Sequence, residues 1–234
     1  MRIRLFALAL VAFLCFICSS CSTKKEEKKN QLTPKLITEK QAKSEIDHSF
    51  DFDTTEWFEI TSDMKGITLD IRYASNNNFT KQQIYPCGRC FFRPELGEKI
   101  KQLGKDVAMR YGMTLKIFDC YRPAPAQQKL WDIVPDARYV TPPSKGSMHN
   151  RGLAIDVTLI NKEGKELDMG TAYDFFGIEA HTDNFNHSDN VLKNRKILKE
   201  LFNAHGLSGI RTEWWHFSLQ SEKAPLDSWE WNCD

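Results

Sequence analysis

The sequence carries almost no excess charge of either sign. Its 234 residues include 32 Lys and Arg against 31 Asp and Glu, which gives a formal net charge of +1. A nucleic-acid-binding domain needs a basic excess to meet phosphates, so this balance argues against a nucleic-acid partner. The chain also lacks internal repeats and a regular alternation of strands and helices. With 41% hydrophobic residues, it predicts a single α+β domain with a central antiparallel sheet flanked by helices.

The sequence also lacks an apolar run long enough to cross a bilayer comfortably. Its longest run, LFALALVAFLCFIC, follows Arg2 and Arg4 and precedes the small residues SSCS. A positive start, a short apolar core and a small-residue end are typical of a secretory signal. Cys21 is preceded by two serines, as in the cleavage box of bacterial lipoproteins, although Cys18 stands where that box usually has leucine.

These features predict a lipoprotein-type signal at residues 1–20 and lipidation of Cys21. An ordinary signal peptide with an incidental cysteine is the alternative. Residues 21–48 are charged, polar and poor in apolar periodicity, which predicts a flexible tether. Residues 49–234 then form the folded domain. We therefore expect an exported protein of the bacterial cell envelope, held at a membrane by an N-terminal lipid.

Four cysteines lie beyond this N-terminal region: Cys87, Cys90, Cys120 and Cys233. In an exported chain they can form disulfides, and four cysteines allow three complete pairings. The stretch CGRC at 87–90 would also suit a redox or zinc motif, but the chain has no second CxxC. A structural disulfide or inert thiols are therefore favoured.

Periodicity predicts the main elements of the domain. Strands are expected over 66–74, over 113–122, from near Gly152 onward, and over 209–220. Helices are expected over 94–112, 125–134 and 189–205, the last with Asp189 as its N-cap and Gly206 as its stop. A hairpin-like turn is expected over 159–167, with Gly164 at its tip.

The stretch SMHNRGLAIDVTL, residues 147–159, places His149 and Asp156 beside a strongly apolar run. A buried carboxylate is costly unless it is paired or binds a metal. His216 lies in EWWHF, three residues after Glu213. Two imidazoles and a carboxylate plus one water make a catalytic zinc site, in which Glu213 suits the base that takes a proton from the water. A set of buried polar residues, with Glu213 in a salt bridge at a strand end, is the alternative.

These segments also carry a resemblance to a known family. SMHNRGLAID follows the S-x-H-x-x-G-x-A-x-D pattern of the zinc D,D-peptidases, and EWWH matches their second motif. EWWH in particular resembles the D-alanyl-D-alanine dipeptidases, the class that includes the vancomycin-resistance dipeptidase. The related D,D-carboxypeptidases typically have proline where Trp214 stands. The similarity extends over roughly residues 60–220, through DIRYASNNNFT, DCYRPAPAQ and MGTAYDFF.

The resemblance implies a role for each matched residue. His149, Asp156 and His216 correspond to the ligands of one zinc ion. Glu213 corresponds to the general acid/base and Arg122 to the arginine that stabilises the oxyanion, a task that suits a permanently charged guanidinium. A salt bridge that simply fixes the loop before Pro123 is the alternative for Arg122.

Three further positions match residues that bind substrate in the family. Ser147 matches a serine that contacts the substrate, while Tyr73 and Asp174 match positions near its free amino group. Tyr73 as a plain strand residue and Asp174 as a turn or cap are the alternatives. His181, His187 and His205 lie outside the matched motifs and receive no role.

The function that this resemblance implies is zinc-dependent hydrolysis of D-alanyl-D-alanine to two D-alanines. A D,D-carboxypeptidase that trims cell-wall peptides is the nearest alternative, and a non-catalytic wall-binding lipoprotein is another. Because the dipeptide precursor is made in the cytoplasm, export suits scavenging or wall recycling better than resistance. The physiological dipeptide and the oligomeric state stay open.

Overall fold

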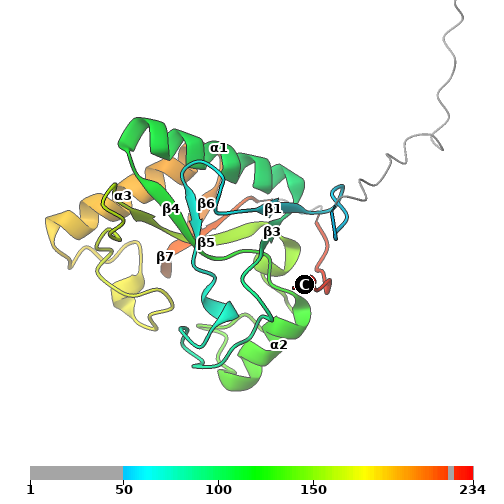
Figure 1. Cartoon of the computed structure of the whole chain (residues 1–234). Helices are drawn as coiled ribbons and strands as arrows, with labels where there is room; N and C mark the ends of the chain where they lie inside the picture. The colour runs from blue at the N-terminus through cyan, green and yellow to red at the C-terminus, as the bar shows by residue number, and fades with distance from the viewer. Residues whose placement is uncertain (1–49, 221–223, 234) are drawn as a thin grey trace, which may run out of the picture. The chain divides into compact units, whose positions relative to one another are not determined.

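The computed structural model describes residues 50–220 and 224–233. The expected signal peptide, tether and lipidated Cys21 lie outside these residues. Among the residues described, no helix is both long enough and apolar enough to span a membrane. The described residues form an α+β domain with three α-helices and two sheets (Figure 1).

The larger sheet has five strands in the order β2-β4-β5-β7-β6. The strands are β2 (Ile67–Leu69), β4 (Thr114–Asp119), β5 (Ala154–Ile160), β6 (Ser208–Ile210) and β7 (Glu213–Ser218). All neighbouring pairs are antiparallel except β2 and β4, which are parallel, so the expected antiparallel sheet is a mixed one. β1 (Phe58–Ile60) and β3 (Cys90–Phe92) form a separate two-stranded sheet.

Two long helices lie together on one side of the five-stranded sheet, and α2 (Ala124–Ile133) lies on the other (Figure 1). α1 (Pro94–Tyr111) begins with proline in its first turn and ends at Gly112, whose φ of 62° is left-handed. Its buried residues recur with the helical period: Leu96, Ile100, Leu103 and Val107. This stripe packs against the sheet, and the helix predicted over 94–112 is confirmed.

α3 (Asp189–Ala204) covers the end of the sheet that β6 and β7 form. The Ser188 hydroxyl accepts a hydrogen bond from the backbone N–H of Val191, so Ser188 is the N-cap and not Asp189 as expected. Phe202 is fully buried and stacks on Phe217 of β7, with ring centroids 4.2 Å apart. This contact joins the helix to the strand that begins at Glu213.

The structure corrects three other expected elements. Residues 66–74 form the short strand β2 and a 3₁₀ turn, Arg72–Ala74, so Tyr73 is not in a strand. The expected strand near Gly152 begins at Ala154, after a 3₁₀ turn at His149–Arg151. Residues 209–220 are the hairpin of β6 and β7 and not one strand, since the chain reverses at 211–212.

Two disulfides use the four cysteines of the domain, Cys87–Cys233 and Cys90–Cys120. The two cysteines of CGRC therefore belong to different bonds, and neither a redox pair nor a zinc motif is formed. Cys90–Cys120 joins β3 to the end of β4, and Cys87–Cys233 fastens the C-terminal segment to the domain.

We predict that Phe202→Ala destabilises the protein by about 3–5 kcal/mol, because it opens a cavity between α3 and β7. Urea denaturation measures the change. The matched control is Met109→Ala on α1, whose side chain is exposed, and we expect its effect to stay within about 0.5 kcal/mol. A Phe202→Ala effect as small as that of the control would contradict the packing.

Candidate metal centre and active site

Strand register places three polar residues in a row across the sheet. Asp119 of β4 is the cross-strand partner of Asp156 of β5, and Asp156 is the partner of His216 of β7. Directly paired residues in a sheet point to the same face with adjacent side chains. Asp119 and Asp156 are 37 positions apart in the sequence, and Asp156 and His216 are 60 apart. The register of the strands brings all three together at one point on the sheet.

His149 joins this row from the 3₁₀ turn that precedes β5. The turn ends at Gly152, which has a φ of +68°, a conformation that costs little only for glycine. A Cβ there would lie 2.7 Å from the Trp57 ring, so the close packing also requires glycine. The turn directs the imidazole of His149 back over Asp156.

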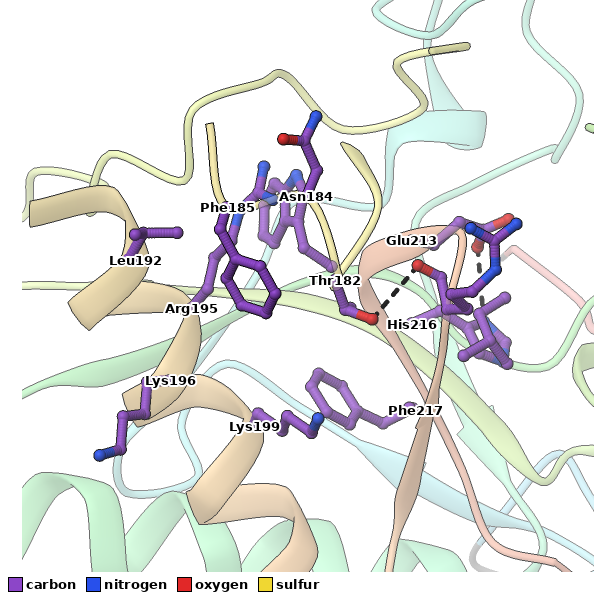
Figure 2. Close-up of a pocket in the computed structure, with 14 residues that line it drawn as sticks. Thr182, Asn184, Phe185, Leu192, Arg195, Lys196, Lys199, Glu213, His216 and Phe217 are labelled. Carbon is purple, nitrogen blue, oxygen red and sulfur yellow. Dashed lines mark hydrogen bonds and ion pairs between the residues drawn. The ribbon is translucent and has the colours of Figure 1, made fainter. Parts of the chain in front are cut away.

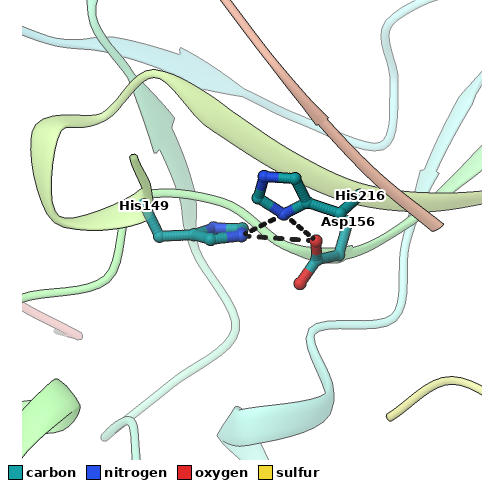
Figure 3. A group of neighbouring side chains, drawn as sticks. All are labelled: His149, Asp156 and His216. Carbon is teal, nitrogen blue, oxygen red and sulfur yellow. Dashed lines mark hydrogen bonds and ion pairs between the residues drawn. The ribbon is translucent and has the colours of Figure 1, made fainter. Parts of the chain in front are cut away.

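The side chains of His149, Asp156 and His216 converge on one point (Figure 3). His149 Nε2 lies 3.3 Å from Asp156 Oδ1 and 3.1 Å from His216 Nδ1, and the latter lies 3.0 Å from Asp156 Oδ1. Tetrahedral zinc ligands at about 2.0–2.1 Å from the ion are about 3.3 Å apart. The three donor atoms therefore fit the separations of a metal-bound set.

Neighbouring groups fix the state of these candidate ligands. His149 Nδ1 lies 2.7 Å from the carbonyl oxygen of Cys120. Because a carbonyl only accepts, Nδ1 carries the proton and Nε2 presents its lone pair to the cluster. Burial raises the pKa of Asp156, but the two imidazoles outweigh it and hold that pKa well below its usual range. The Tyr173 hydroxyl donates to the other oxygen of Asp156, at 3.1 Å.

Glu213 lies beside the cluster, with its carboxylate 4.0 Å from His216 Nδ1. Residues three apart face opposite sides of a regular strand. The register of β6 and β7 shifts between Gly209 and Ile210, and such irregularities redirect side chains, so Glu213 and His216 both line one cavity. Burial raises the pKa of Glu213 to about 7, partly offset by His216. A carboxyl with this pKa can both accept and donate a proton near neutral pH.

Arg122 is buried and held by two side chains. Its guanidinium donates to Asp119 Oδ2 at 2.6 and 3.1 Å and to Gln127 Oε1 at 2.9 Å. Tyr85 donates to the other oxygen of Asp119, at 2.7 Å. Burial alone would lower the pKa of Arg122, but Asp119 raises it well above its usual value. The guanidinium is therefore a fixed positive charge beside the cluster.

Tyr73 and Asp174 meet although they are 101 residues apart. The Tyr73 hydroxyl donates to Asp174 Oδ2 at 2.9 Å. Asp174 has a φ of 56°, unusual for a residue other than glycine, and such backbone is concentrated at functional sites. Burial and the nearby charge of Asp156 raise the pKa of Asp174 well above its usual value. A cation arriving there would favour the charged carboxylate.

A cavity of about 600 Å³ unites the residues that the sequence singled out. All eight line it: Tyr73, Arg122, Ser147, His149, Asp156, Asp174, Glu213 and His216. A second cavity, of about 570 Å³, lies between α3 and the β6–β7 hairpin and shares Ile210, Glu213 and His216 with the first (Figure 2). It is lined mainly by apolar side chains and by basic residues of α3.

The sequence did not single out the residues that support this site. Asp119 and Gln127 hold Arg122, Tyr173 bonds to Asp156, and Asn150 bonds to Ser147. Each lies inside one of the segments that resemble the zinc D,D-peptidases: DCYRPAPAQ, MGTAYDFF or SMHNRGLAID. Their proximity to the motifs was the available signal, but only the fold shows what each one contacts.

Two imidazoles, a buried carboxylate, a carboxyl with a raised pKa and a fixed guanidinium around one cavity define a metal-dependent hydrolase site. The family described as D-Ala-D-Ala dipeptidase matches residues 53–231, and the chain belongs to this family.

Relatives of known name agree with this assignment. The D-alanyl-D-alanine dipeptidase of Escherichia coli K12 is 34% identical over 184 residues, which cover 77% of this chain and 94% of the relative. The enzymes of the same name from Enterococcus faecium and Enterococcus faecalis are 30% and 27% identical, covering 68% and 69% of this chain and 89% and 90% of theirs.

We predict that His149→Ala abolishes binding of a divalent metal at the site, because two donor atoms hold the ion far less tightly than three. Metal analysis of dialysed protein measures the stoichiometry, which we expect to fall from one equivalent to near zero. His205→Gln is the control, since His205 pairs with Asp106 outside the site. Equal metal content in His149→Ala and the parent protein would remove His149 from the ligand set.

Proposed function

We propose that this protein is a zinc-dependent dipeptidase that hydrolyses D-alanyl-D-alanine to two D-alanines. The observation that carries the proposal is the single cavity in which the candidate metal ligands, Glu213, Arg122 and Asp174 all meet. Membership of the dipeptidase family and the names of the relatives support the same reaction. They do not favour a carboxypeptidase or a non-catalytic binding protein.

The donor set favours zinc among the divalent metals, since two imidazoles and one carboxylate leave a position for water. Held by His149, Asp156 and His216, zinc would supply a Lewis acid and a water whose pKa is lowered to about 7. The supporting contacts of Cys120 and Tyr173 keep the ligands in the orientation that the ion needs.

Glu213 is the proton carrier of the reaction. It accepts a proton from the attacking water and then donates it to the nitrogen of the leaving D-alanine, as general acid/base catalysis requires. Its position beside His216, without being needed to complete the ligand set, suits this role. A raised pKa suits a group that must change protonation state twice in each cycle.

Arg122 stabilises the negative charge that develops on the carbonyl oxygen during attack. Asp119 and Gln127 hold the guanidinium before the substrate arrives, so little reorganisation is needed in the transition state. Asp174 and Tyr73 bind the free ammonium of the dipeptide. A peptide acylated at this nitrogen has no positive charge there, so this pair selects dipeptides over longer cell-wall peptides.

We also propose that the protein is exported and anchored through lipidated Cys21, where it recovers D-alanine from the envelope. The four cysteines of the domain are all oxidised, and disulfides persist mainly outside the cytoplasm. The N-terminal sequence supports the same location, because its charged start, apolar core and SSCS segment are typical of lipoprotein signals.

We predict release of D-alanine from D-Ala-D-Ala and at least about a hundredfold slower release from N-acetyl-D-Ala-D-Ala, because only the former offers an ammonium to Asp174. An assay for free D-alanine, with and without a chelator, measures both. We expect the chelator to abolish release and added zinc to restore it. Faster release from the acylated peptide would make this protein a carboxypeptidase.

We predict that Glu213→Gln lowers kcat for D-Ala-D-Ala by about 10²–10⁴-fold, the usual contribution of a general acid/base. Metal analysis should still find one equivalent of zinc, because Glu213 is not a ligand. The control is Glu163→Gln at the tip of the 159–167 turn, where the side chain is largely exposed. Loss of zinc together with activity in Glu213→Gln would make Glu213 a ligand instead.

A further inference from the structure

A dipeptide carries two charges, and the residues discussed so far account for only one of them. Its ammonium has Asp174, but its carboxylate also needs a partner, because burying an unpaired charge in a cavity is costly. An inference about the partner of this carboxylate rests on the proposed dipeptidase function. The hydrogen bonds around Ser147 and the basic side chains of the cavity indicate that partner.

Asn150 has a fixed orientation next to Ser147. Its side-chain NH₂ donates to the carbonyl oxygen of Arg122 at 2.7 Å, and its Oδ1 accepts from the backbone N–H of Ser147 at 2.8 Å. A carbonyl can only accept and an N–H can only donate, so the amide of Asn150 cannot be turned over. Asn150 is also buried.

This orientation determines what the Ser147 hydroxyl can offer to a substrate. Its Oγ lies 3.0 Å from Asn150 Oδ1, which has no hydrogen, so the hydroxyl proton is donated to Asn150. The backbone N–H of Asn150 also donates to Ser147 Oγ, at 3.4 Å, so the hydroxyl has only acceptor capacity left for a substrate. A carboxylate is also an acceptor, and Ser147 therefore suits a donor group of the substrate, such as an N–H, better than its carboxylate.

Three lysine and arginine side chains line this cavity, and two of them make hydrogen bonds to the protein. Arg122 is bound to Asp119 and Gln127, and Arg151 donates to the carbonyl oxygen of Ala224 at 2.6 Å. Lys145 is the third. Within residues 50–220 and 224–233, its ammonium makes no ion pair or side-chain hydrogen bond.

The backbone of the Lys145 loop is held in place although the side chain is exposed. The N–H groups of Lys145 and Gly146 both donate to the carbonyl oxygen of Pro142, at 2.9 and 3.1 Å. Gly146 has a φ of +66°, and Leu226 packs so closely that a Cβ there would lie 2.2 Å from its side chain. A long, flexible side chain thus extends from a fixed point at the cavity.

We propose that Lys145 binds the C-terminal carboxylate of the dipeptide. Its positive charge would hold this end of the substrate, as the negative charge of Asp174 holds the ammonium at the other end. Recognition of both ends by single charges would make the site selective for free dipeptides. Lys145 is a substrate-binding residue in this account and takes no part in bond cleavage. Its loss should therefore act on KM and leave kcat nearly unchanged.

The test compares D-Ala-D-Ala with its uncharged analogue D-alanyl-D-alaninamide. In the parent protein we expect KM to be about tenfold higher for the amide, the lower end for loss of a charge-assisted hydrogen bond. In Lys145→Gln we expect KM for D-Ala-D-Ala to rise about tenfold, with kcat within about twofold, and the discrimination against the amide to disappear. Lys145→Arg should restore most of it, because the charge is kept.

Two variants serve as controls. Lys199→Gln removes a lysine that lines the second cavity (Figure 2) and should change neither constant. Arg151→Gln should leave the ratio of the two KM values, amide over dipeptide, as it is in the parent protein. If Arg151→Gln abolishes this difference while Lys145→Gln keeps it, the carboxylate binds Arg151 and the proposal is wrong. An unchanged KM in Lys145→Gln, with D-Ala-D-Ala still cleaved, overturns this inference alone. A parent protein that cleaves neither compound overturns the dipeptidase proposal as well.

Discussion

The cross-strand register of β4, β5 and β7 is the constraint on which the rest of the site depends. It places Asp119, Asp156 and His216 side by side on one face of the sheet. A slip of one residue would send these side chains to the opposite face. Backbone hydrogen bonds and the buried packing of α1 and α3 therefore stabilise the catalytic geometry as well as the fold.

Two side chains of the site, His149 and Arg122, are held in place by a second residue. The Cys120 carbonyl orients His149, and Cys120 is itself tied to β3 through its disulfide with Cys90. Asp119 holds Arg122. The oxidised Cys90–Cys120 bond thus lies at the segment that orients both His149, the proposed metal ligand, and Arg122, the proposed oxyanion-stabilising charge. An envelope location, where such bonds persist, is consistent with this design.

The electrostatics of the cavity follow from placing several charges out of water. Asp156 keeps its negative charge because two imidazoles face it. Glu213 lies near one imidazole, that of His216, and Asp174 accepts a hydrogen bond from Tyr73, but burial outweighs these contacts and raises both pKa values. Groups of the same chemical type are thereby suited to the different tasks that we propose for them: Asp156 to binding metal, Glu213 to carrying a proton, and Asp174 to meeting an arriving ammonium.

The sequence by itself determined the α+β class, the helix over 94–112 and the turn at Gly164, because local periodicity is written along the chain. The spacing of its motifs pointed to His149, Asp156, Glu213 and His216. Tyr73, Arg122, Ser147 and Asp174 followed from the resemblance of whole segments to a family. Tertiary structure decided the disulfide pairing, the 3₁₀ turn at Tyr73 and the break between β6 and β7. It also decided the orientation of the Asn150 amide, which sets what the Ser147 hydroxyl can offer to a substrate. These features depend on contacts between residues distant in the chain, and no local pattern encodes such contacts.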